Sequence, residues 1–192
     1  MRLAIFGGSF DPPHVGHLLV AQDACDQLSI DRLLFMPASS QPLKAQGAAA
    51  GAEHRLAMVR LLAGDDPRFE VSAMEVERGG LSYTVDTLAA VAGRHAGAEL
   101  LLLVGADVLR TFRQWREPER ILELARLVVV RRGDEQDTAA PVPDGAIRLT
   151  ARRLDVSSTE IRERVRHGRS IRGFVTDAVA AYIARTGLYH EG

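Results

Sequence analysis

The chain has 192 residues, of which 46% are hydrophobic and 26% are charged, and its formal net charge is −1. This length gives one domain with a substantial core, and the composition is ordinary for a globular protein. The near-zero charge argues against nucleic acid or a membrane surface as a partner, and no apolar run approaches the ~20 residues of a membrane span. The N-terminus has no basic region ahead of an apolar stretch, and the one cysteine excludes a disulfide framework, so we expect a cytoplasmic protein without a signal peptide.

The first predicted elements are a buried strand, a glycine turn and a helix. Residues 3–6 form an apolar run typical of a parallel strand, and the glycine pair at 7–8 lets the backbone turn sharply and approach a ligand. Apolar residues then recur with a helical period over 15–28. A helix N-terminus after a glycine turn is a natural site for phosphate. His14 and His17, three residues apart in the first helical turn, would point toward the same anion.

Two other interpretations of this histidine pair are weaker. A metal site would need a third ligand nearby, and the usual helical chelate is H-x-x-x-H. If the two histidines were ordinary residues at a helix start, the glycine turn just before them would have no explanation. The spacing also differs from the dinucleotide fingerprint G-x-G-x-x-G and from a Walker loop, because no Lys-Ser or Lys-Thr follows. The pattern therefore favours contact with phosphate.

The second predicted strand, residues 33–36, ends at Pro37. A loop rich in Ser, Gln, Gly and Ala follows over 37–52, and its mobility is left open by the sequence. Lys44 lies in this loop and is the only lysine of the chain. Such a preference for arginine usually reflects genome composition, yet a lone lysine just after a strand is a candidate site residue.

The rest of the chain alternates between predicted helices and strands. The helices cover residues 53–62, 85–91, 117–124, 158–166 and 176–185, and the strands cover 69–74, 100–104, 127–130 and 147–149, with a loop at 133–145. Continuous apolar strands are typical of a mostly parallel sheet covered on both faces, which predicts a doubly wound α/β fold with ligands at the carboxyl ends of the strands. We expect one domain over residues 1–192, in which 157–192 form a small helical C-terminal subregion.

Polar residues after the later strands add candidates. Gly105 ends the strand at 100–104, and Asp107 follows it. An acid at this place either hydrogen-bonds a ribose hydroxyl or caps a helix, and the sequence favours neither role over the other. Trp115, the only tryptophan, is either a core anchor or a stacking partner for an aromatic ligand. Thr84 is a candidate cap for the helix at 85–91, whose first N–H groups would suit a small carboxylate.

A helix start near the C-terminus carries a further polar group. Ser157 with Glu160 fits a capping box, and taken alone that structural role is the better interpretation. The hydroxyls of Ser157, Ser158 and Thr159, together with free N–H groups and Arg162, also form a cradle suited to phosphate.

Together, these motifs resemble the nicotinate-nucleotide adenylyltransferase family of the H-x-G-H nucleotidyltransferase superfamily. The similar segments are Gly-Gly-Ser-Phe-Asp-Pro-Pro-His-Val-Gly-His at 7–17, Ser-Tyr-Thr-Val-Asp-Thr-Leu at 82–88, Gly-Ala-Asp at 105–107 with Phe112 and Trp115, and Ser-Ser-Thr-Glu-Ile-Arg at 157–162. Tyr182-Ile183 and Gly187-Leu188-Tyr189 are similar as well, so the resemblance runs from residue 1 to about residue 189.

The resemblance implies a Rossmann-like fold and transfer of an adenylyl group from ATP to nicotinate mononucleotide, giving nicotinate adenine dinucleotide and pyrophosphate in NAD biosynthesis. The implied catalytic residues are His14, His17, Lys44 and Arg162. The implied ATP contacts are Gly7, Gly8, Ser9, Phe10, Gly105, Asp107, Ser157, Ser158 and Thr159. The implied contacts to nicotinate mononucleotide are His54, Arg55, Tyr83, Thr84 and Trp115. Mg²⁺ would travel on the ATP phosphates, with no metal ligand assigned to the protein.

One segment departs from the family pattern. The family usually has Pro-Pro-His-Lys after the second strand, whereas this chain has Gln-Pro-Leu-Lys at 41–44. Lys44 matches, but no histidine precedes it. Any phosphate contact of that histidine is either lost or taken over by His54 and Arg55, which open the next helix.

Two alternatives stay open at this point. The first is the same chemistry on another acceptor, nicotinamide mononucleotide or phosphopantetheine, and the residues at 83–84 and Trp115 argue more strongly against the latter. The second is a non-catalytic nucleotide sensor, which the presence of His14, His17 and Arg162 disfavours. The oligomeric state is not determined by the sequence, and a homo-oligomer is compatible with it.

Overall fold

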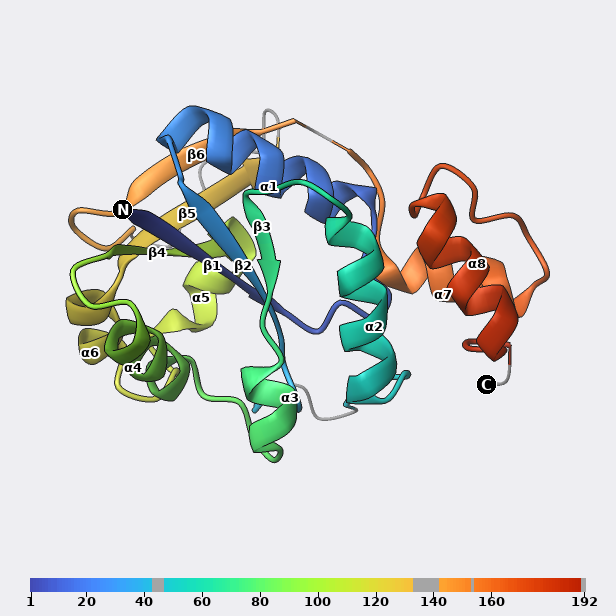
Figure 1. Ribbon diagram of the computed structural model, residues 1–192, viewed down its shortest axis with the longest axis horizontal. Coiled ribbons are helices and arrows are strands. Elements are labelled where there is room, and N and C mark those ends of the chain that lie inside the picture. Colours follow the sequence, from blue (N-terminus) through green and yellow to red (C-terminus); the bar gives the residue numbers. More distant parts are fainter. Residues whose placement is uncertain (43–46, 133–141, 153, 191–192) are drawn as a thin grey trace.

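The computed structural model describes residues 1–42, 47–132, 142–152 and 154–190. In these residues six strands form one parallel sheet with the order β3-β2-β1-β4-β5-β6 (Figure 1). The strands are β1 (Arg2–Gly8), β2 (Arg32–Pro37), β3 (Phe69–Val71), β4 (Glu99–Gly105), β5 (Arg126–Arg132) and β6 (Ile147–Ala151). This order is that of the doubly wound dinucleotide-binding fold, so the predicted fold class is confirmed.

Helices cover both faces of the sheet (Figure 1). The first face carries α1 (Val15–Leu28) and α2 (Ala52–Ala63), and the core on this side continues past α2 to α7 (Ser158–Arg166) and α8 (Asp177–Thr186). The second face carries α4 (Thr84–Arg94), α5 (Leu109–Phe112) and α6 (Pro118–Leu124). Alternate strand residues point to opposite faces, so Ala4 packs in the first layer and Leu3 in the second. Burial on both faces explains why these strands are continuous apolar runs.

One predicted element differs in extent. The strand expected over 69–74 ends at Val71, and the short helix α3 (Met74–Arg78) begins where the strand was expected to continue. The Ser72 hydroxyl accepts the backbone N–H of Met74 at 3.3 Å, which turns the chain out of the sheet. The predicted loop at 133–145 lies outside the described residues as far as residue 141.

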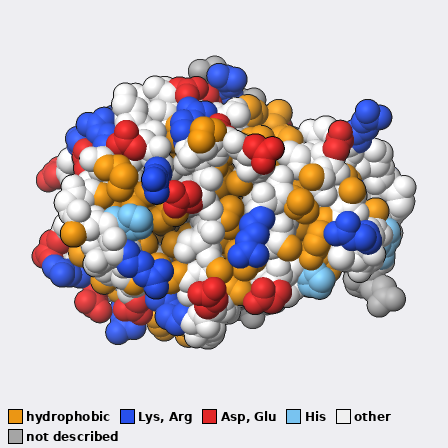
Figure 2. All heavy atoms as spheres, in the orientation of Figure 1, with side chains coloured by type: hydrophobic (Ala, Val, Ile, Leu, Met, Phe, Trp, Pro, Cys, Tyr) orange, Lys and Arg blue, Asp and Glu red, His pale blue; other side chains and the backbone are white. Residues whose placement is uncertain are grey.

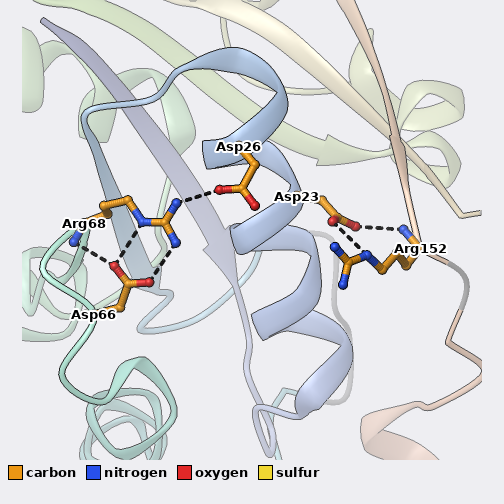
Figure 3. Close-up of polar contacts among 5 residues, drawn as sticks. All are labelled: Asp23, Asp26, Asp66, Arg68 and Arg152. Carbon is orange, nitrogen blue, oxygen red and sulfur yellow. Dashed lines mark hydrogen bonds and ion pairs between the residues drawn. The ribbon is translucent and has the colours of Figure 1, made fainter.

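Ion pairs fasten α1 to both edges of the sheet (Figure 3). Asp23, 5% exposed, accepts the backbone N–H of Arg152 at 2.8 Å, just beyond β6. Asp26 accepts a hydrogen bond of 2.7 Å from Arg68, whose guanidinium also binds Asp66 with two bonds, just before β3. Segments next to both edge strands thus contact the helix whose N-terminus carries the two histidines.

The C-terminal helices α7 and α8 lie at one end of the molecule beside α2, and they share its apolar core (Figure 1). The limits of the domain at 1–192 and of the subregion at 157–192 stay predictions. Positive and negative side chains are interspersed over the face shown in Figure 2. Among the described residues no helix is both long and apolar enough to cross a membrane.

Candidate active site

A cleft of about 350 Å³ opens where β1, β2 and β4 end. Its walls are the glycine turn after β1, the start of α4 and the segment between α5 and α6. The predicted site residues that line it are Gly7, Gly8, Tyr83, Thr84, Gly105 and Trp115. Residues predicted for the ATP side and for the acceptor side therefore border one cleft, at the carboxyl edge of the sheet where ligands of this fold class bind.

His14 and His17 stand at the N-terminal end of α1. His14 is the N-cap residue, and its backbone N–H donates to Nδ1 of His17 at 3.2 Å. The two imidazole rings lie against each other, with centroids 3.7 Å apart and planes tilted by 34°. Because a backbone N–H can only donate, Nδ1 of His17 is the acceptor, and a neutral His17 ring carries its proton on Nε2. The His14 backbone thus sets the tautomer of the His17 ring.

Phe10 lies in the core beneath the histidines. Its side chain is buried, and its ring centroid lies 5.0 Å from that of His17 and 5.7 Å from that of Phe6. A nucleotide contact by Phe10 is therefore restricted to its backbone. The neighbouring Ser9 hydroxyl donates to the side-chain oxygen of Gln41 at 2.9 Å, which joins the β1 turn to the segment after β2.

Arg55 binds the backbone of the surrounding loops. Its side chain is 2% exposed, and its guanidinium donates to the backbone carbonyls of Ser9, Ala38, Ser39 and Ala50 at 2.7–3.0 Å. Burial lowers the pKa of this guanidinium, although the nearby Asp11 charge acts in the opposite direction. This guanidinium is enclosed by four carbonyls and is not part of the cleft wall, so the predicted contact of Arg55 with the substrate gains no support here and stays a prediction. Arg55 holds together the loops that follow β1 and β2.

The N-terminus of α7 meets the turn before His14. The Arg162 guanidinium donates to the backbone carbonyl of Asp11 at 2.7 Å, and the Ser158 hydroxyl donates to that of Pro12 at 2.8 Å. The Ser157 hydroxyl accepts the Glu160 N–H at 3.2 Å, so the expected N-cap is confirmed. The first and last predicted phosphate motifs are thus in contact, although about 145 residues separate them in the chain.

The predicted acceptor residues border the cleft from its other side. Tyr83, not Thr84, is the N-cap residue of α4, and Thr84 is the first residue inside the helix. Trp115 is half-buried and lines the cleft. It also packs against the core of the second face, with its ring centroid 5.5 Å from that of Phe112. The Arg116 guanidinium lies 5.0 Å from the centre of the Tyr83 ring, a cation–π contact at the rim.

The remaining predicted residues lie in varied places. Asp107 is exposed in a single 3₁₀ turn (Ala106–Val108) whose N-cap is Gly105, so it is not a helix cap. His54 faces α8, where its Nδ1 lies 2.9 Å from the Tyr182 hydroxyl oxygen, and it is not part of the cleft wall. Lys44 lies outside the described residues.

Sequence reasoning missed two buried acids at this edge of the sheet. Glu75, in α3, lines the cleft and accepts a hydrogen bond of 2.6 Å from the Thr87 hydroxyl. Burial raises the pKa of Glu75, while hydrogen bonds from Thr87 and Ser82 act in the opposite direction. Asp11, inside the first motif, accepts three hydrogen bonds. The position of Asp11 before two prolines was an available signal, whereas nothing near Glu75 in the sequence marks it as buried.

Comparison with known proteins agrees with this geometry. A cytidylyltransferase-like family model matches residues 5–164. A probable nicotinate-nucleotide adenylyltransferase of Gemmatimonas aurantiaca is 54% identical over an alignment that spans 100% of this chain and 93% of the relative. One of Thermus thermophilus is 45% identical, with 98% of this chain and 100% of the relative covered.

Solved structures show the same fold at much lower identity. Nicotinic acid mononucleotide adenylyltransferase of Plasmodium falciparum, complexed with NaAD, superposes with a TM-score of 0.79 at 17% identity, covering 98% of this chain and 97% of that one. The sheet order, the contact between the two phosphate motifs and the identity to curated relatives over nearly the whole length all agree. The chain therefore belongs to the nicotinate-nucleotide adenylyltransferases of the cytidylyltransferase-like family.

Proposed function

We propose that the protein transfers the adenylyl group of ATP to nicotinate mononucleotide and releases pyrophosphate. The observation that carries this proposal is the single cleft bordered by both the glycine turn after β1 and the start of α4 with Trp115. A nucleotide bound at the first wall and a pyridine ring bound at the second would meet at the sheet edge. The activity is also the one in the names of relatives up to 54% identical.

The reaction needs no covalent intermediate and no protein base. An oxygen of the acceptor phosphate attacks the α-phosphorus of ATP in line, a new P–O–P bridge forms, and the bond to the β-phosphate oxygen breaks as pyrophosphate leaves. The acceptor phosphate is already an anionic nucleophile, so the protein contributes position and charge stabilisation. The positive end of the α1 dipole and the His17 imidazole are proposed to stabilise the charge that moves onto the leaving pyrophosphate.

Arg162 has a second part in this scheme. Its guanidinium already donates to the Asp11 carbonyl and, at 3.3 Å, to the Thr159 hydroxyl, so its orientation is set before a substrate arrives. The remaining N–H groups of the fork suit a phosphate oxygen. We also propose that Lys44 contacts a phosphate of the substrate and that Asp107 accepts a hydrogen bond from a ribose hydroxyl.

ATP is proposed to enter as its Mg²⁺ complex, with the ion held by phosphate oxygens and water. Mg²⁺ commonly keeps several waters and binds through substrate phosphates. Within the described residues no group of three His, Cys, Asp or Glu side chains is arranged to hold a metal. We also place the reaction in the cytoplasm, where a buried unpaired thiol such as that of Cys25 is normal.

The acceptor preference tests the proposal. Nicotinate carries a carboxylate that gains charge-assisted hydrogen bonds from N–H groups at the start of α4. The NH₂ group of nicotinamide would face the same donors and leave them unpaired, at about 1–3 kcal/mol each. We therefore expect kcat/KM for nicotinate mononucleotide to exceed that for nicotinamide mononucleotide at least roughly 10²-fold.

The measurement is pyrophosphate release from ATP with a panel of acceptors: nicotinate mononucleotide, nicotinamide mononucleotide, phosphopantetheine and none. Trp115→Ala is the companion variant, because stacking does not sense the carboxylate and its loss should lower kcat/KM for both pyridine nucleotides alike. Equal kcat/KM for the two in the wild type would contradict the assignment of α4 to the carboxylate. No release with any acceptor would reject the enzyme altogether.

A further inference from the structure

The carboxylate of Asp11 joins three separate segments of the chain. Its Oδ2 accepts the backbone N–H of Ala49 at 2.6 Å, and its Oδ1 accepts that of Ala50 at 3.0 Å. Oδ1 also accepts the hydroxyl of Tyr189 at 2.8 Å, across 178 positions of sequence. Asp11 is 6% exposed, so these partners replace most of its contact with water. The carboxylate thus connects the β1 turn, the entry to α2 and the C-terminal segment.

The Asp11 turn leads directly into the histidine pair. Asp11 is followed by Pro12 and Pro13 and then by His14, the N-cap of α1. Proline fixes its own φ angle, so two in succession make the link between Asp11 and His14 stiff. A shift of the Asp11 carboxylate is therefore passed on to the His14 backbone, whose N–H orients the His17 ring.

Tyr189 is well suited to hold this carboxylate. Burial raises the pKa of its hydroxyl, and the charge of Asp11 beside it raises the pKa further, so the group remains a donor at any working pH. Its backbone φ of +68° turns the chain after α8 so that the ring packs against the core shared by α1 and α2. Tyr189 does not line the cleft, and the hydrogen bond of its hydroxyl goes to Asp11, with the Arg162 guanidinium close enough to act on its pKa in the opposite direction. A role in catalysis would therefore act through its neighbours, of which Asp11 is the one that it binds.

We propose that Tyr189 is a positioning residue for adenylyl transfer: its hydroxyl fixes the Asp11 carboxylate and, through the two prolines, the geometry of His14 and His17. This inference rests on the proposed function, in which the histidines stabilise charge in the transition state. Loss of the hydroxyl leaves Asp11 with two N–H partners, enough to keep the turn but not to fix it. The effect then falls on kcat and not on substrate affinity.

The test is Tyr189→Phe, which deletes one oxygen atom and keeps the ring. We expect kcat for pyrophosphate release to fall about tenfold, with KM for ATP and for nicotinate mononucleotide within about twofold of the wild type. Val179→Ala is the control, because Val179 is fully buried in α8 and takes no part in the hydrogen bonds of the Asp11 carboxylate. It should lower Tm at least as much as Tyr189→Phe does, yet leave kcat unchanged well below Tm.

A double-mutant cycle identifies the route of the effect. Asp11→Asn keeps the shape of the side chain but removes its charge, and it should lower kcat at least as much as Tyr189→Phe. If Tyr189 acts through Asp11, adding Tyr189→Phe to Asp11→Asn causes no further loss. Additive losses, or wild-type kcat in Tyr189→Phe, would overturn the inference. So would an equal fall of kcat in Val179→Ala.

A second measurement does not depend on turnover. The imidazole NMR signals of His14 and His17 should move in Tyr189→Phe and stay in place in Val179→Ala. A wild type without activity would defeat the proposed function, whereas the NMR comparison would still decide whether Tyr189 positions the histidines. Unmoved histidine signals in Tyr189→Phe would refute the positioning role even in an active enzyme.

Discussion

Gly16 lies between the two histidines at a place where a side chain has no room. A Cβ atom there would stand 3.0 Å from Nδ1 of His14 and 3.1 Å from Cγ1 of Val156. Both neighbours are buried, so neither can move aside easily. A side chain at residue 16 would therefore push His14 or Val156 aside by a few tenths of an ångström.

The variant Gly16→Ala tests this packing. We expect it to lower stability by about 1–3 kcal/mol and kcat at least tenfold, because the His14 ring must tilt. The matched control is Gly93→Ala, near the end of α4, where a Cβ would meet nothing within 4 Å and where alanine should stabilise the helix by about 0.5–1 kcal/mol. Urea unfolding and pyrophosphate release measure both variants. Wild-type kcat in Gly16→Ala would show that the ring has room.

Cys25 gives a prediction about reactivity. The thiol is 4% exposed, and burial raises its pKa from 9.0 to about 11, with the nearby Arg68 guanidinium acting in the opposite direction. This rise in the pKa of the thiol lowers the fraction present as thiolate near pH 8 roughly 10²-fold, and the thiolate is the reactive form. Ellman's reagent should therefore modify the folded protein at least roughly 10²-fold more slowly than the urea-unfolded chain. Similar rates would mean that α1 opens readily.

At the scale of elements, α3 and α4 are joined by a chain of polar groups that runs from the exposed Arg78 to the buried Thr87, Glu75 and Ser82. Arg78 donates to the Thr87 hydroxyl at 3.0 Å, and Thr87 donates to Glu75. The Ser82 hydroxyl binds Glu75 as well and accepts the backbone N–H of Ser39 at 3.0 Å. This chain fixes the start of α4, where the nicotinate carboxylate is proposed to bind, to the loop after β2.

The buried carboxyl of Glu75 makes stability depend on pH. Burial raises its pKa above the ordinary value of 4.5, so the folded protein binds this proton more tightly than the unfolded chain does. Its contribution to stability is fully present below pH 4.5 and is lost as pH rises through the raised pKa. The difference in unfolding free energy between Glu75→Gln and the wild type should therefore shift in favour of the variant between pH 4 and pH 8. Urea unfolding across this range measures it, with the exposed Glu77→Gln as control, and parallel curves for wild type and Glu75→Gln would contradict it.

Most elements could be predicted because their signals are local. The helical period over 15–28 and the apolar run at 100–104 need no knowledge of the rest of the chain. The end of β3 was missed because one hydroxyl, that of Ser72, turns the backbone there. The cap of α4 was placed one residue too late, at Thr84 instead of Tyr83, an error typical of element boundaries.

At the scale of the whole molecule, the sheet order and the cleft follow from the alternation of strands and helices, and the fold was predictable for that reason. In contrast, the sequence could not predict which charged side chains are buried. Arg55 follows a predicted loop and resembles a phosphate ligand in sequence, but only the packed structure shows the four carbonyls around it. Asp11 and Tyr189 were unassigned because sequence proximity gives no sign of a contact between residues so far apart.

That contact also has a consequence for how the protein is made. At roughly 5–20 residues per second, a ribosome needs roughly 10–40 s to extend the chain from Asp11 to Tyr189, which lies 178 positions later. For nearly all of this time a nascent chain has both histidines and the glycine turn, but the Asp11 carboxylate lacks the hydroxyl of Tyr189. Translation that stops just before codon 189 would yield a chain with every strand and helix described here but with this hydroxyl absent. The hydrogen bond between Tyr189 and Asp11 can therefore form only after the ribosome has synthesised all of α8.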